Sequence, residues 1–378
     1  MNSHIVSFLL NFEVSQKIMD SINNFLGFDA LSLVSFLIFF VAAFIVANAM
    51  AVIGGLGTYA ERKISADLQA RQGPNRVGPY GLLQFIADFV KLISKEDIIP
   101  KKADKLLYTI APVLCMVGIM GTLAVIPYSS GFILTDLNIG VFYLLGVSSL
   151  IGVGIFLGGY SSNSKWSMLG GMRGASQIIS YEIPVTLSIL AVVLLAGGVS
   201  MQTLVKGQEG GILNWFIFHN PFSFIAFFVY FIGALAEANR APFDLPEAES
   251  ELVSGYHTEY SGMRFSFFAL AEYIEVFVLS SVAAALFLGG HNVPFNFGKE
   301  IFIGQFLQLG VFLAKAFALF YIVIWIRWTL PRLRVDQLMT VCWKYLTPIG
   351  IFNLIGCAIW MYAFSGKSLY MLLFKSAH

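Results

Sequence analysis

The chain has 378 residues, of which 57% are hydrophobic and 12% are charged, and its formal net charge is +1. Soluble globular domains carry about a quarter charged residues, so this composition argues against a soluble domain and indicates a protein largely surrounded by lipid. The near-zero charge gives no sign of a nucleic-acid-binding surface. The N-terminal apolar stretch, residues 5–10, lacks the basic start and the cleavage site of a secretory signal.

Eight apolar stretches are each about long enough to cross a bilayer, which takes about 20 residues. Because backbone polar groups cannot remain unpaired in lipid, we expect these stretches to be helices. The sequence therefore predicts an all-α polytopic membrane protein with about eight transmembrane helices, in a single integral membrane domain over residues 1–378. The expected spans are residues 30–56, 107–127, 139–160, 176–199, 221–238, 264–289, 305–327 and 344–365.

Lysine and arginine residues are concentrated on one side of these expected spans. The loops that follow the first, third, fifth and seventh spans, together with the span ends that border them, hold 17 of the 23, whereas the opposite side and the termini hold five. The positive-inside rule then places the three long loops, residues 57–106, 239–263 and 328–343, in the cytoplasm. Both termini are expected on the outer side of the membrane.

The first of these loops contains two helix-like stretches, separated by a turn-rich segment with glycine and proline at residues 73–81. In the second stretch, residues 82–93, apolar side chains form one stripe and polar side chains the opposite face. The stripe consists of Leu82, Phe85, Ile86, Phe89 and Ile93, and the polar face of Gln84, Asp88, Lys91 and Lys95. This pattern predicts an amphipathic helix on the membrane surface, so we expect surface amphipathic helices in this loop.

The sequence contains no motif that indicates a bound metal or nucleotide. The three cysteines are Cys115, Cys342 and Cys357. They are not spaced as metal ligands, and apolar surroundings are typical of buried, inert cysteines. Gly152, Gly154 and Gly158 lie inside an apolar span with no strand before them, which favours close helix packing over phosphate binding. We therefore expect no metal and no redox cofactor in this chain.

Acidic residues are concentrated in one part of the chain, and several lie within or beside apolar spans. Eight of the 22 lie between residues 237 and 275: Glu237, Asp244, Glu247, Glu249, Glu251, Glu259, Glu272 and Glu275. Glu182 lies at the start of the fourth span. An ionised acid at mid-membrane costs about 3 kcal/mol on insertion scales, and such residues typically mark a proton or ion route. For Glu247, Glu249 and Glu251, a position on the cytoplasmic surface is equally consistent with the sequence.

Crowded carboxylates cannot all ionise in a low-dielectric site, so some of their pKa values rise and the acids titrate as a set. Arg240, Arg264 and Lys315 are candidates for balancing cations. Arg264, Phe268 and Glu272 also step by four residues along the sixth span, so they share one face of a helix. A cation, a ring and an acid in line suit a flat molecule with a polar head and an apolar tail, such as a quinone.

Four long motifs resemble those of a known family. They are ERK at 61–63 with QARQGPNRVGPYGLLQ at 69–84, QIISYE at 177–182, AEANRAPFDLPEAESELVSGYHTEY at 236–260, and PRLRVDQLM at 331–339. Together they resemble the H-type (subunit 1) membrane subunits of the proton-pumping NADH:quinone oxidoreductase, respiratory complex I, in their bacterial form. The resemblance covers roughly residues 30–350.

This resemblance implies a subunit at the junction of the membrane arm and the peripheral arm, in the bacterial cell (inner) membrane with both termini periplasmic. Such a subunit binds no cofactor itself. It forms a cavity for the substrate, a quinone such as ubiquinone, with peripheral-arm subunits, one of which carries the terminal iron–sulfur cluster. Electrons from NADH pass through FMN and iron–sulfur clusters in partner subunits. Quinone reduction is coupled to proton translocation through an acidic channel that leads to small membrane subunits and antiporter-like subunits.

Residue roles follow from matching positions. The resemblance implies a quinone cavity at Arg62, Asp88 and Lys91, to which the stepped residues Arg264 and Phe268 are added. The implied proton route consists of Glu182, Glu237, Asp244, Glu247, Glu249 and Glu272. Residues that would support it are Arg240, Glu251, Glu259 and Lys315. Residues that would dock the peripheral arm are Arg332, Arg334, Asp336 and Gln337. Ala248 replaces a glycine that is common in the family, and Glu275 and Arg264 are not fixed features of it.

Two other functions remain open at this point. A homologous anchor subunit of a membrane-bound hydrogenase-type complex would share the fold, although the motifs at 73–81 and 249–255 resemble the respiratory version more closely. A free-standing secondary transporter would also account for buried charges. Transporters usually contain inverted repeats, and the sequence has no evident repeat.

Overall fold

The computed structural model describes residues 30–247, 249–293 and 302–364. Every regular element in these ranges is a helix, which confirms the all-α prediction. Seven helices in them are long and apolar enough to cross a membrane, and a further apolar helix, α10 (Pro221–Glu237), has 17 residues. The seven are Ala43–Leu68, Lys105–Leu123, Gly140–Ser161, Lys165–Ala196, Gly262–Phe287, Gly304–Thr329 and Val335–Phe364. The chain is therefore a polytopic membrane protein.

The described residues up to Ile53 and those from Gly54 onward form two compact units. Helix α3 (Ala30–Leu68) begins in the first unit and ends in the second. The long helices of the second unit are α5 (Lys105–Leu123), α6 (Gly140–Ser161), α7 (Lys165–Ala196), α10, α12 (Gly262–Phe287), α13 (Phe302–Thr329) and α15 (Thr347–Phe364). Short helices connect them: α8 (Met201–Lys206), α9 (Phe216–His219), α11 (Glu249–Leu252) and the 3₁₀ turns Ile212–Asn214 and Gly255–His257.

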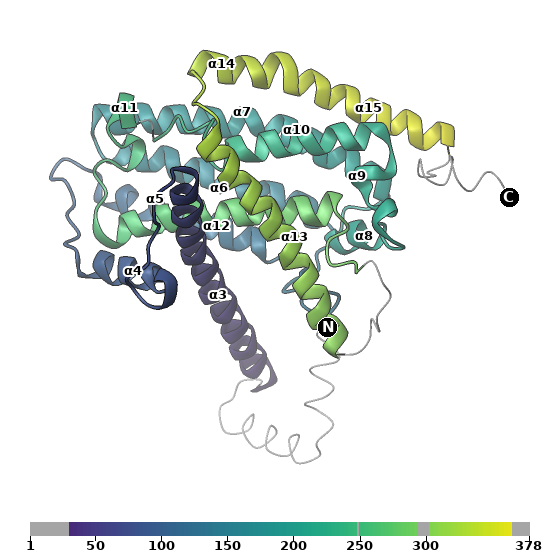
Figure 1. Ribbon diagram of the computed structural model, residues 1–378, viewed down its shortest axis with the longest axis horizontal. Helices are drawn as coiled ribbons and strands as arrows, with labels where there is room; N and C mark the ends of the chain where they lie inside the picture. Colours follow the sequence, from purple (N-terminus) through teal and green to yellow (C-terminus); the bar gives the residue numbers. More distant parts are fainter. Residues whose placement is uncertain (1–29, 248, 294–301, 365–378) are drawn as a thin grey trace. The chain divides into compact units, whose positions relative to one another are not determined.

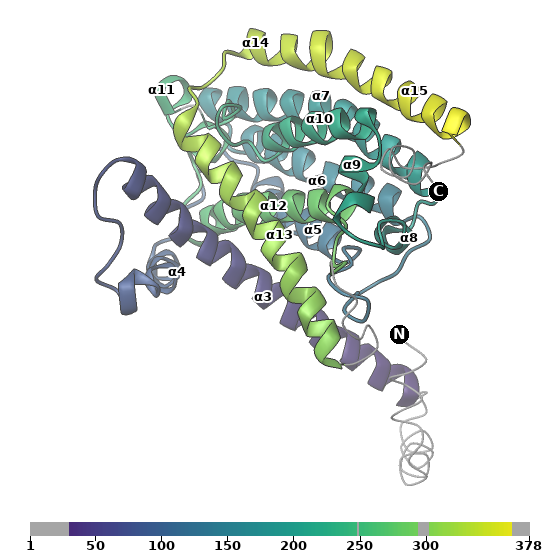
Figure 2. The ribbon, with the colours of Figure 1, turned by 45° about the vertical axis from the view of Figure 1, so that its right-hand side comes forward.

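Helix α12 lies at the centre of this second unit, in contact with α5, α7, α10 and α13 (Figure 2). In its most apolar stretch 83% of the residues are buried inside the protein, compared with 22–56% in the other six spans. Acids on α12 are therefore surrounded by neighbouring helices and not by lipid, which is the usual condition for an ionisable residue at membrane depth.

The last span, the α14–α15 rod (Val335–Phe364), is one continuous helix that contains a π-helical segment. Helix α14 (Val335–Thr340) continues through a π-helical stretch, Val341–Leu346, into α15. Figure 1 shows this rod in yellow along α7 and α10, and α15 contacts both. A π-helical stretch is rare and is frequently found at functional sites. Here Cys342 Sγ of this stretch lies 3.0 Å from the carbonyl oxygen of Ser180 on α7, two residues before Glu182.

Helix α7 begins at Lys165, eleven residues before the expected start of the fourth span at residue 176. The early part is rich in glycine, which normally weakens a helix. Tertiary packing explains the difference: a Cβ atom on Gly171 would lie 3.0 Å from the Cα of Gly159 on α6, and one on Gly170 would lie 2.7 Å from the Tyr256 nitrogen. Only glycine permits these approaches, so packing stabilises a helical turn that local propensity disfavours.

The loop at 57–106 contains one separate surface helix. The second expected stretch is α4 (Gln84–Ser94), on which the apolar side chains Ile86, Phe89 and Ile93 are exposed. The first expected stretch is the end of α3, because no proline interrupts residues 30–68 and the helix ends before Gly73. The turn Pro79–Gly81 then reverses the chain. The exposed apolar residues of α4 are those of a helix that lies at a membrane interface.

Candidate functional site

Arg240 is buried in the turn after α10, where two carboxylates and an aromatic ring surround it. Its side chain is 5% exposed, with Nη1 3.6 Å from Glu61 Oε2 and Nη2 3.8 Å from Glu272 Oε2. The guanidinium carbon lies 4.2 Å from the centre of the Tyr273 ring. Glu61 Oε1 lies 2.6 Å from Nη1 of Arg327 on α13. Because unpaired buried charges are costly, this mutual pairing allows Glu61, Arg240, Glu272 and Arg327, the arginine–acid cluster, to remain inside the protein.

The turn that carries Arg240 is held by α7. Helix α10 ends at Glu237, and Asn239 adopts a φ of +50°, a left-handed conformation that asparagine tolerates better than most residues. On α7, Gln177 Nε2 donates to the carbonyl oxygens of Ala236 (2.7 Å) and Phe243 (2.8 Å), one on each side of the turn. Arg240 is therefore held in a fixed position by a buried amide.

The charge of Arg240 is permanent in this environment. Burial by itself lowers the pKa of Arg240, but the Tyr273 ring and the carboxylates of Glu61 and Glu272 oppose it, and the net effect raises the pKa. A fixed cation at this position favours the ionised form of whichever neighbouring acid is closest. The acids around it, and not Arg240, are thus the groups that are able to exchange protons.

Glu247 and Glu272 form an acid pair between the 238–261 loop and α12. The two side chains share a hydrogen bond, and burial together with the Glu272 charge raises the pKa of Glu247 well above its usual value. Glu247 Oε1 also lies 3.4 Å from His257 Nδ1. On the other side, the Tyr256 hydroxyl donates to Glu272 Oε1 at 2.9 Å. Glu247 therefore holds a proton more strongly than an ordinary glutamate, and Glu272 is the member of the pair that lies beside Arg240.

Asp244 lies in the same loop at the edge of the arginine–acid cluster. Burial and the Glu272 charge raise the pKa of Asp244, and Arg332 and Arg327 act against this shift. Asp244 Oδ2 lies 4.0 Å from Nη2 of Arg332. Asp244, Glu247 and Glu272 therefore respond to one another, as coupled acids do.

A second set of acids lies deeper among the helices. Glu182 of α7 and Glu237 at the end of α10, both expected in the proton route, line one internal cavity of about 20 Å³. Glu275 of α12 lines it as well, together with Thr122, Ser148 and Ser149. The structure thus brings three acids from three helices to a space that holds about one water molecule.

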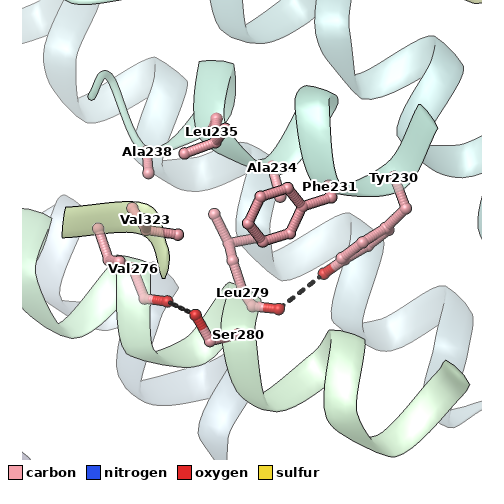
Figure 3. Close-up of a pocket in the computed structure, with 9 residues that line it drawn as sticks. All are labelled: Tyr230, Phe231, Ala234, Leu235, Ala238, Val276, Leu279, Ser280 and Val323. Atoms are coloured by element: carbon pink, nitrogen blue, oxygen red, sulfur yellow. Dashed lines mark hydrogen bonds between the residues drawn. The ribbon is translucent and has the colours of Figure 1, made fainter. Parts of the chain in front are cut away.

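On another face of α12, an apolar pocket of about 10 Å³ separates it from α10 and α13 (Figure 3). Its two hydroxyl groups are already satisfied by backbone carbonyls of α12: Tyr230 donates to Leu279 at 3.0 Å and Ser280 donates to Val276 at 2.8 Å. A space of this size does not accept a quinone ring. The pocket is also without a titratable acid, so it offers protons no alternative route.

The stepped residues of α12 do share a face, but tyrosines cover it. The Phe268 side chain is 2% exposed and packs edge-on against the rings of Tyr256 (5.2 Å) and Tyr260 (4.9 Å). The Tyr260 ring stacks on Tyr108 at 4.0 Å, and Arg264 lies 5.5 Å from the Tyr108 ring centre. Phe268 therefore supports the tyrosine that holds Glu272, and it is not open to a cavity in this structure.

Arg264 points toward the loop before α5. Its Nη1 lies 3.3 Å from Asp97 Oδ1, and the neighbouring Ser261 donates to the carbonyl oxygen of Glu96 at 3.1 Å. These contacts attach the start of α12 to residues 96–97. Arg264 is thereby separated from Glu272, which pairs with Arg240 instead.

The other expected quinone-cavity residues lie together at the junction of α3 and α4. Arg62 Nη1 lies 2.6 Å from Asp88 Oδ2, and Lys91 Nζ lies 3.5 Å from Asp88 Oδ1. Arg62 also lines a wide concave surface of about 630 Å³, with Arg71 and Arg76 among its lining residues. These three arginines make the concave surface strongly cationic.

The remaining expected acids are distributed around the loop. Glu251 lies at the surface, 2.6 Å from Nη1 of Arg173, and this arginine lowers the pKa of Glu251. The backbone carbonyl of Glu259 accepts a hydrogen bond from the Tyr108 hydroxyl at 2.7 Å. Glu249 begins α11, but its side chain and the whole of Ala248 lie outside the described residues. Glu251 and Glu259 therefore lie apart from the Glu247–Glu272 pair.

Lys315 lies apart from the acids. Its Nζ donates to the carbonyl oxygens of Leu288 (2.8 Å), Gly290 (2.9 Å) and Asn292 (3.3 Å) and lies 4.3 Å from the Trp215 ring centre. Leu288 follows the end of α12, about 24 Å along the helix from Glu272 at 1.5 Å per residue. A cation at a helix C-terminus satisfies its free carbonyls and favours its dipole, so Lys315 fastens the segment after α12.

Replacing Lys315 with methionine is expected to destabilise the assembled protein by about 2–3 kcal/mol, because three charge-assisted hydrogen bonds are lost from buried carbonyls. Lys315→Arg retains a donor and is expected to recover part of this loss. The measurement is the thermal midpoint of the purified complex, with Lys206→Met, at an exposed lysine of α8, as the control. An unchanged midpoint for Lys315→Met would contradict the fastening role.

Some buried residues of the site had no role assigned from sequence. Glu61 belongs to the motif at 61–63, but its pairs with Arg240 and Arg327 join residues that are more than 170 positions apart in the sequence. The signal available was that each is a charge inside a long apolar stretch. Nothing in the sequence indicated a role for Tyr256 and Tyr273, because an aromatic side chain in an apolar protein most often only fills the core.

The residues expected to dock a peripheral arm lie where α13 ends and α14 begins. Arg332 pairs with Asp244, and the Arg334 backbone nitrogen donates to Gln337 Oε1 at 3.2 Å, which caps the start of α14. Asp336 lies in the first turn of α14, a favourable position for an acid. Within the described ranges, no group of three or more His, Cys, Asp or Glu is arranged to hold a metal ion.

Comparison of the sequence with known proteins identifies its family. The family model described as NADH dehydrogenase matches residues 16–358. The chain belongs to the NADH dehydrogenase family. The H-type subunit of the NADH-quinone oxidoreductase of Anaeromyxobacter dehalogenans is 45% identical over 335 residues, 85% of this chain and 81% of the relative. The H-type subunit from Chlorobaculum parvum is 48% identical over 312 residues, 81% of this chain and 87% of the relative. NADH-quinone oxidoreductase subunit 8 of Rhodothermus marinus is 46% identical over 336 residues, 85% of this chain and 97% of the relative.

The NADH dehydrogenase family membership confirms the resemblance to the H-type subunit (subunit 1) of complex I. The chain is thus a multi-pass membrane subunit of an NADH-quinone oxidoreductase, and it acts as part of that assembly. Similarity over most of the length of both chains favours this assignment over a hydrogenase-type anchor or a free-standing transporter.

Proposed function

We propose that the chain forms part of the quinone cavity of complex I and couples quinone reduction to proton translocation through its buried acids. The observation that carries the proposal is the Glu247–Glu272 pair against the permanently charged, buried Arg240. A hydrogen-bonded acid pair beside a fixed cation changes its proton occupancy when a new charge appears nearby. Such a response is what coupling to a redox reaction requires.

The coupling follows from the balance of the quinone reaction. Reduction of a quinone to a quinol consumes two electrons and two protons, and the electrons arrive from NADH through FMN and iron–sulfur clusters in partner subunits. Negative charge that develops on the quinone before it is protonated raises the proton affinity of neighbouring acids. The acid nearest this charge then draws a proton, and Asp244, Glu247 and Glu272 rearrange theirs as a set.

The proposed onward route uses the deeper acids. Glu237 and Glu182 line a cavity that accepts water, and from there protons pass toward small membrane subunits and antiporter-like subunits. Glu249 and Glu251 are proposed to lie at the surface entrance of the proton route, where Glu251 pairs with Arg173. Glu259 and Arg240 support the loop that carries these acids.

The proposed quinone approach is at the α3–α4 junction. Apolar residues of α4 are exposed there beside the charged group Arg62, Asp88 and Lys91. The isoprenoid tail of a quinone suits the apolar residues of α4, and its polar head group suits the charged group. Arg264 and Phe268 are proposed to support this cavity from behind the tyrosines Tyr108, Tyr256 and Tyr260, which separate Phe268 from open space.

The proposal also includes an orientation in the membrane. The loops 57–106, 239–263 and 328–343 are proposed to face the cytoplasm of a bacterial cell and the peripheral arm, including the subunit with the terminal iron–sulfur cluster. Both termini are then periplasmic. Arg332, Arg334, Asp336 and Gln337 are placed on this side to contact the peripheral arm.

A photoreactive quinone tests the location of the cavity. Illumination of the intact complex is expected to label this chain within residues 59–94, because α4 and the end of α3 carry the exposed apolar and charged groups. Mass spectrometry of the digested subunit locates the label, and excess ordinary quinone should prevent it. Labelling of this chain only at the segments 201–219 or 288–293 would contradict the proposed location.

A further inference from the structure

The cavity between α5, α6, α7, α10 and α12 has a third acid that the proposed route does not use. Glu275 of α12 faces it together with Glu182 and Glu237, and hydroxyl groups of Thr122, Ser148 and Ser149 complete the polar lining. Serine and threonine hydroxyls both donate and accept hydrogen bonds. The three hydroxyl groups donate to backbone carbonyls of their own helices and keep their oxygens as acceptors. The three carboxyl groups are therefore the neighbours that exchange protons with a water molecule in this cavity.

Glu275 lacks a protein partner although it is deeply buried. Its side chain is 6% exposed, and it makes no hydrogen bond or ion pair with any residue in the described ranges. A buried polar group without a partner is costly, and buried water commonly supplies the missing hydrogen bonds. The cavity of about 20 Å³ is large enough for about one water molecule, so water is the ligand that this side chain lacks.

The position of Glu275 joins the two acid groups. Glu272 and Glu275 are three residues apart on α12, so they are neighbours on the helix surface, with about 5–6 Å between their Cβ atoms. Glu272 belongs to the acid pair with Glu247, whereas Glu275 lines the cavity of Glu182 and Glu237. One turn of a single buried helix therefore carries one acid of each group.

A second pocket beside α12 lacks the acids of the first. The pocket on another face of the helix is apolar, and its hydroxyl groups on Tyr230 and Ser280 are engaged with backbone carbonyls (Figure 3). This pocket has no carboxyl group that could take up a proton. The cavity at Glu275 is thus the polar continuation of the Glu247–Glu272 pair along this helix.

We propose that Glu275 is a further proton-carrying residue, which transfers protons between Glu272 and the water-containing cavity that it shares with Glu182 and Glu237. This inference rests on the proposed function. In each transfer an O–H bond on the donor carboxyl breaks as one forms on water or on the acceptor carboxylate, and no electron is moved. Glu275 is the link that makes one continuous route of two acid groups.

The test uses the complete complex, reconstituted in vesicles of phosphatidylethanolamine and phosphatidylglycerol. Glu275→Gln is expected to lower NADH-driven quinone reduction and the initial rate of proton uptake on the order of tenfold, which is less than the hundredfold or more usual for proton-transfer residues, because water still fills part of the gap. Glu275→Asp keeps a carboxyl group and is expected to recover most of both rates. Glu96→Gln, at an exposed acid, is the matched control.

A spectroscopic readout separates proton transfer from packing. The infrared difference spectrum between the oxidised and NADH-reduced complex reports the C=O band of carboxyl groups that change protonation. We expect Glu275→Gln to lose part of this band and Glu275→Asp to keep it. Equal loss of activity in both variants together with a lowered thermal midpoint would show a packing role and overturn the inference.

Parallel variants distinguish this inference from the proposed function. Glu182→Gln and Glu237→Gln are expected to be impaired as well. Wild-type rates and an unchanged band in Glu275→Gln, with these two impaired, would overturn the role of Glu275 and leave the proposed function intact. Wild-type rates in all three variants would overturn both.

Discussion

Replacing Glu272 with glutamine is expected to lower NADH-driven quinone reduction at least about a hundredfold, the usual range for a residue that exchanges protons in the reaction. Glu272 holds three contacts at once: the hydrogen bond from Tyr256, the shared hydrogen bond with Glu247 and the ion pair with Arg240. Glutamine keeps the shape but not the charge. The partner of Arg240 and the acceptor of the proton from Glu247 are then lost together.

Glu247→Gln provides the matched comparison. Because the pKa of Glu247 is raised well above its usual value, this acid carries a proton far above the pH at which a free glutamate loses it. Glutamine imitates that protonated form, so we expect normal assembly with a similar loss of turnover. Turnover of the purified complex and the amount of this subunit in it are the two measurements, with Glu96→Gln as the control. Wild-type turnover in both variants would refute the proposed coupling.

The fold was predictable because the length of an apolar run sets its structure in lipid. Each expected span contains a helix in the structure, since no other arrangement pairs the backbone there. The start of α7 was not predictable in the same way. Gly170 and Gly171 disfavour a helix locally, and only their contact with Tyr256 and Gly159 makes a helix stable.

The buried acids were visible in the sequence because a charge inside an apolar run is conspicuous. Their partners were not, since pairing depends on where distant helices meet. Glu61, Arg240 and Arg327 come from three parts of the chain and converge only after α3, α10 and α13 pack together. Lys315 is as conspicuous in the sequence as the acids, but in the part of the chain that the structure describes it binds backbone carbonyls and no acid.

The stepped face of α12 shows why a correct periodicity is insufficient. Spacing by four placed Phe268 and Glu272 on one face, as expected. Whether that face is open depends on what covers it, and Tyr256 and Tyr260 come from a loop whose path the spacing does not define. In this structure the aromatic residue next to Glu272 is a tyrosine that donates a hydrogen bond to it.

Arg240→Met is expected to prevent assembly, because it leaves Glu272 without its cation inside the protein, whereas Glu61 keeps Arg327. Removing one member of a buried ion pair costs about 3–5 kcal/mol, a large fraction of the stability of a typical protein. The amount of this subunit in the purified complex and the thermal midpoint of any complex that forms are the measurements.

Arg240→Lys separates charge from geometry. Lysine restores one positive charge but not the planar group that reaches two carboxylates and lies over the Tyr273 ring. We therefore expect partial assembly with low turnover. Arg173→Gln is the control, because it breaks only the surface pair with Glu251, and such pairs contribute about 0–1 kcal/mol. Normal assembly of Arg240→Met would show that Glu272 does not depend on this cation, which would contradict the proposed role of the Arg240–Glu272 pair.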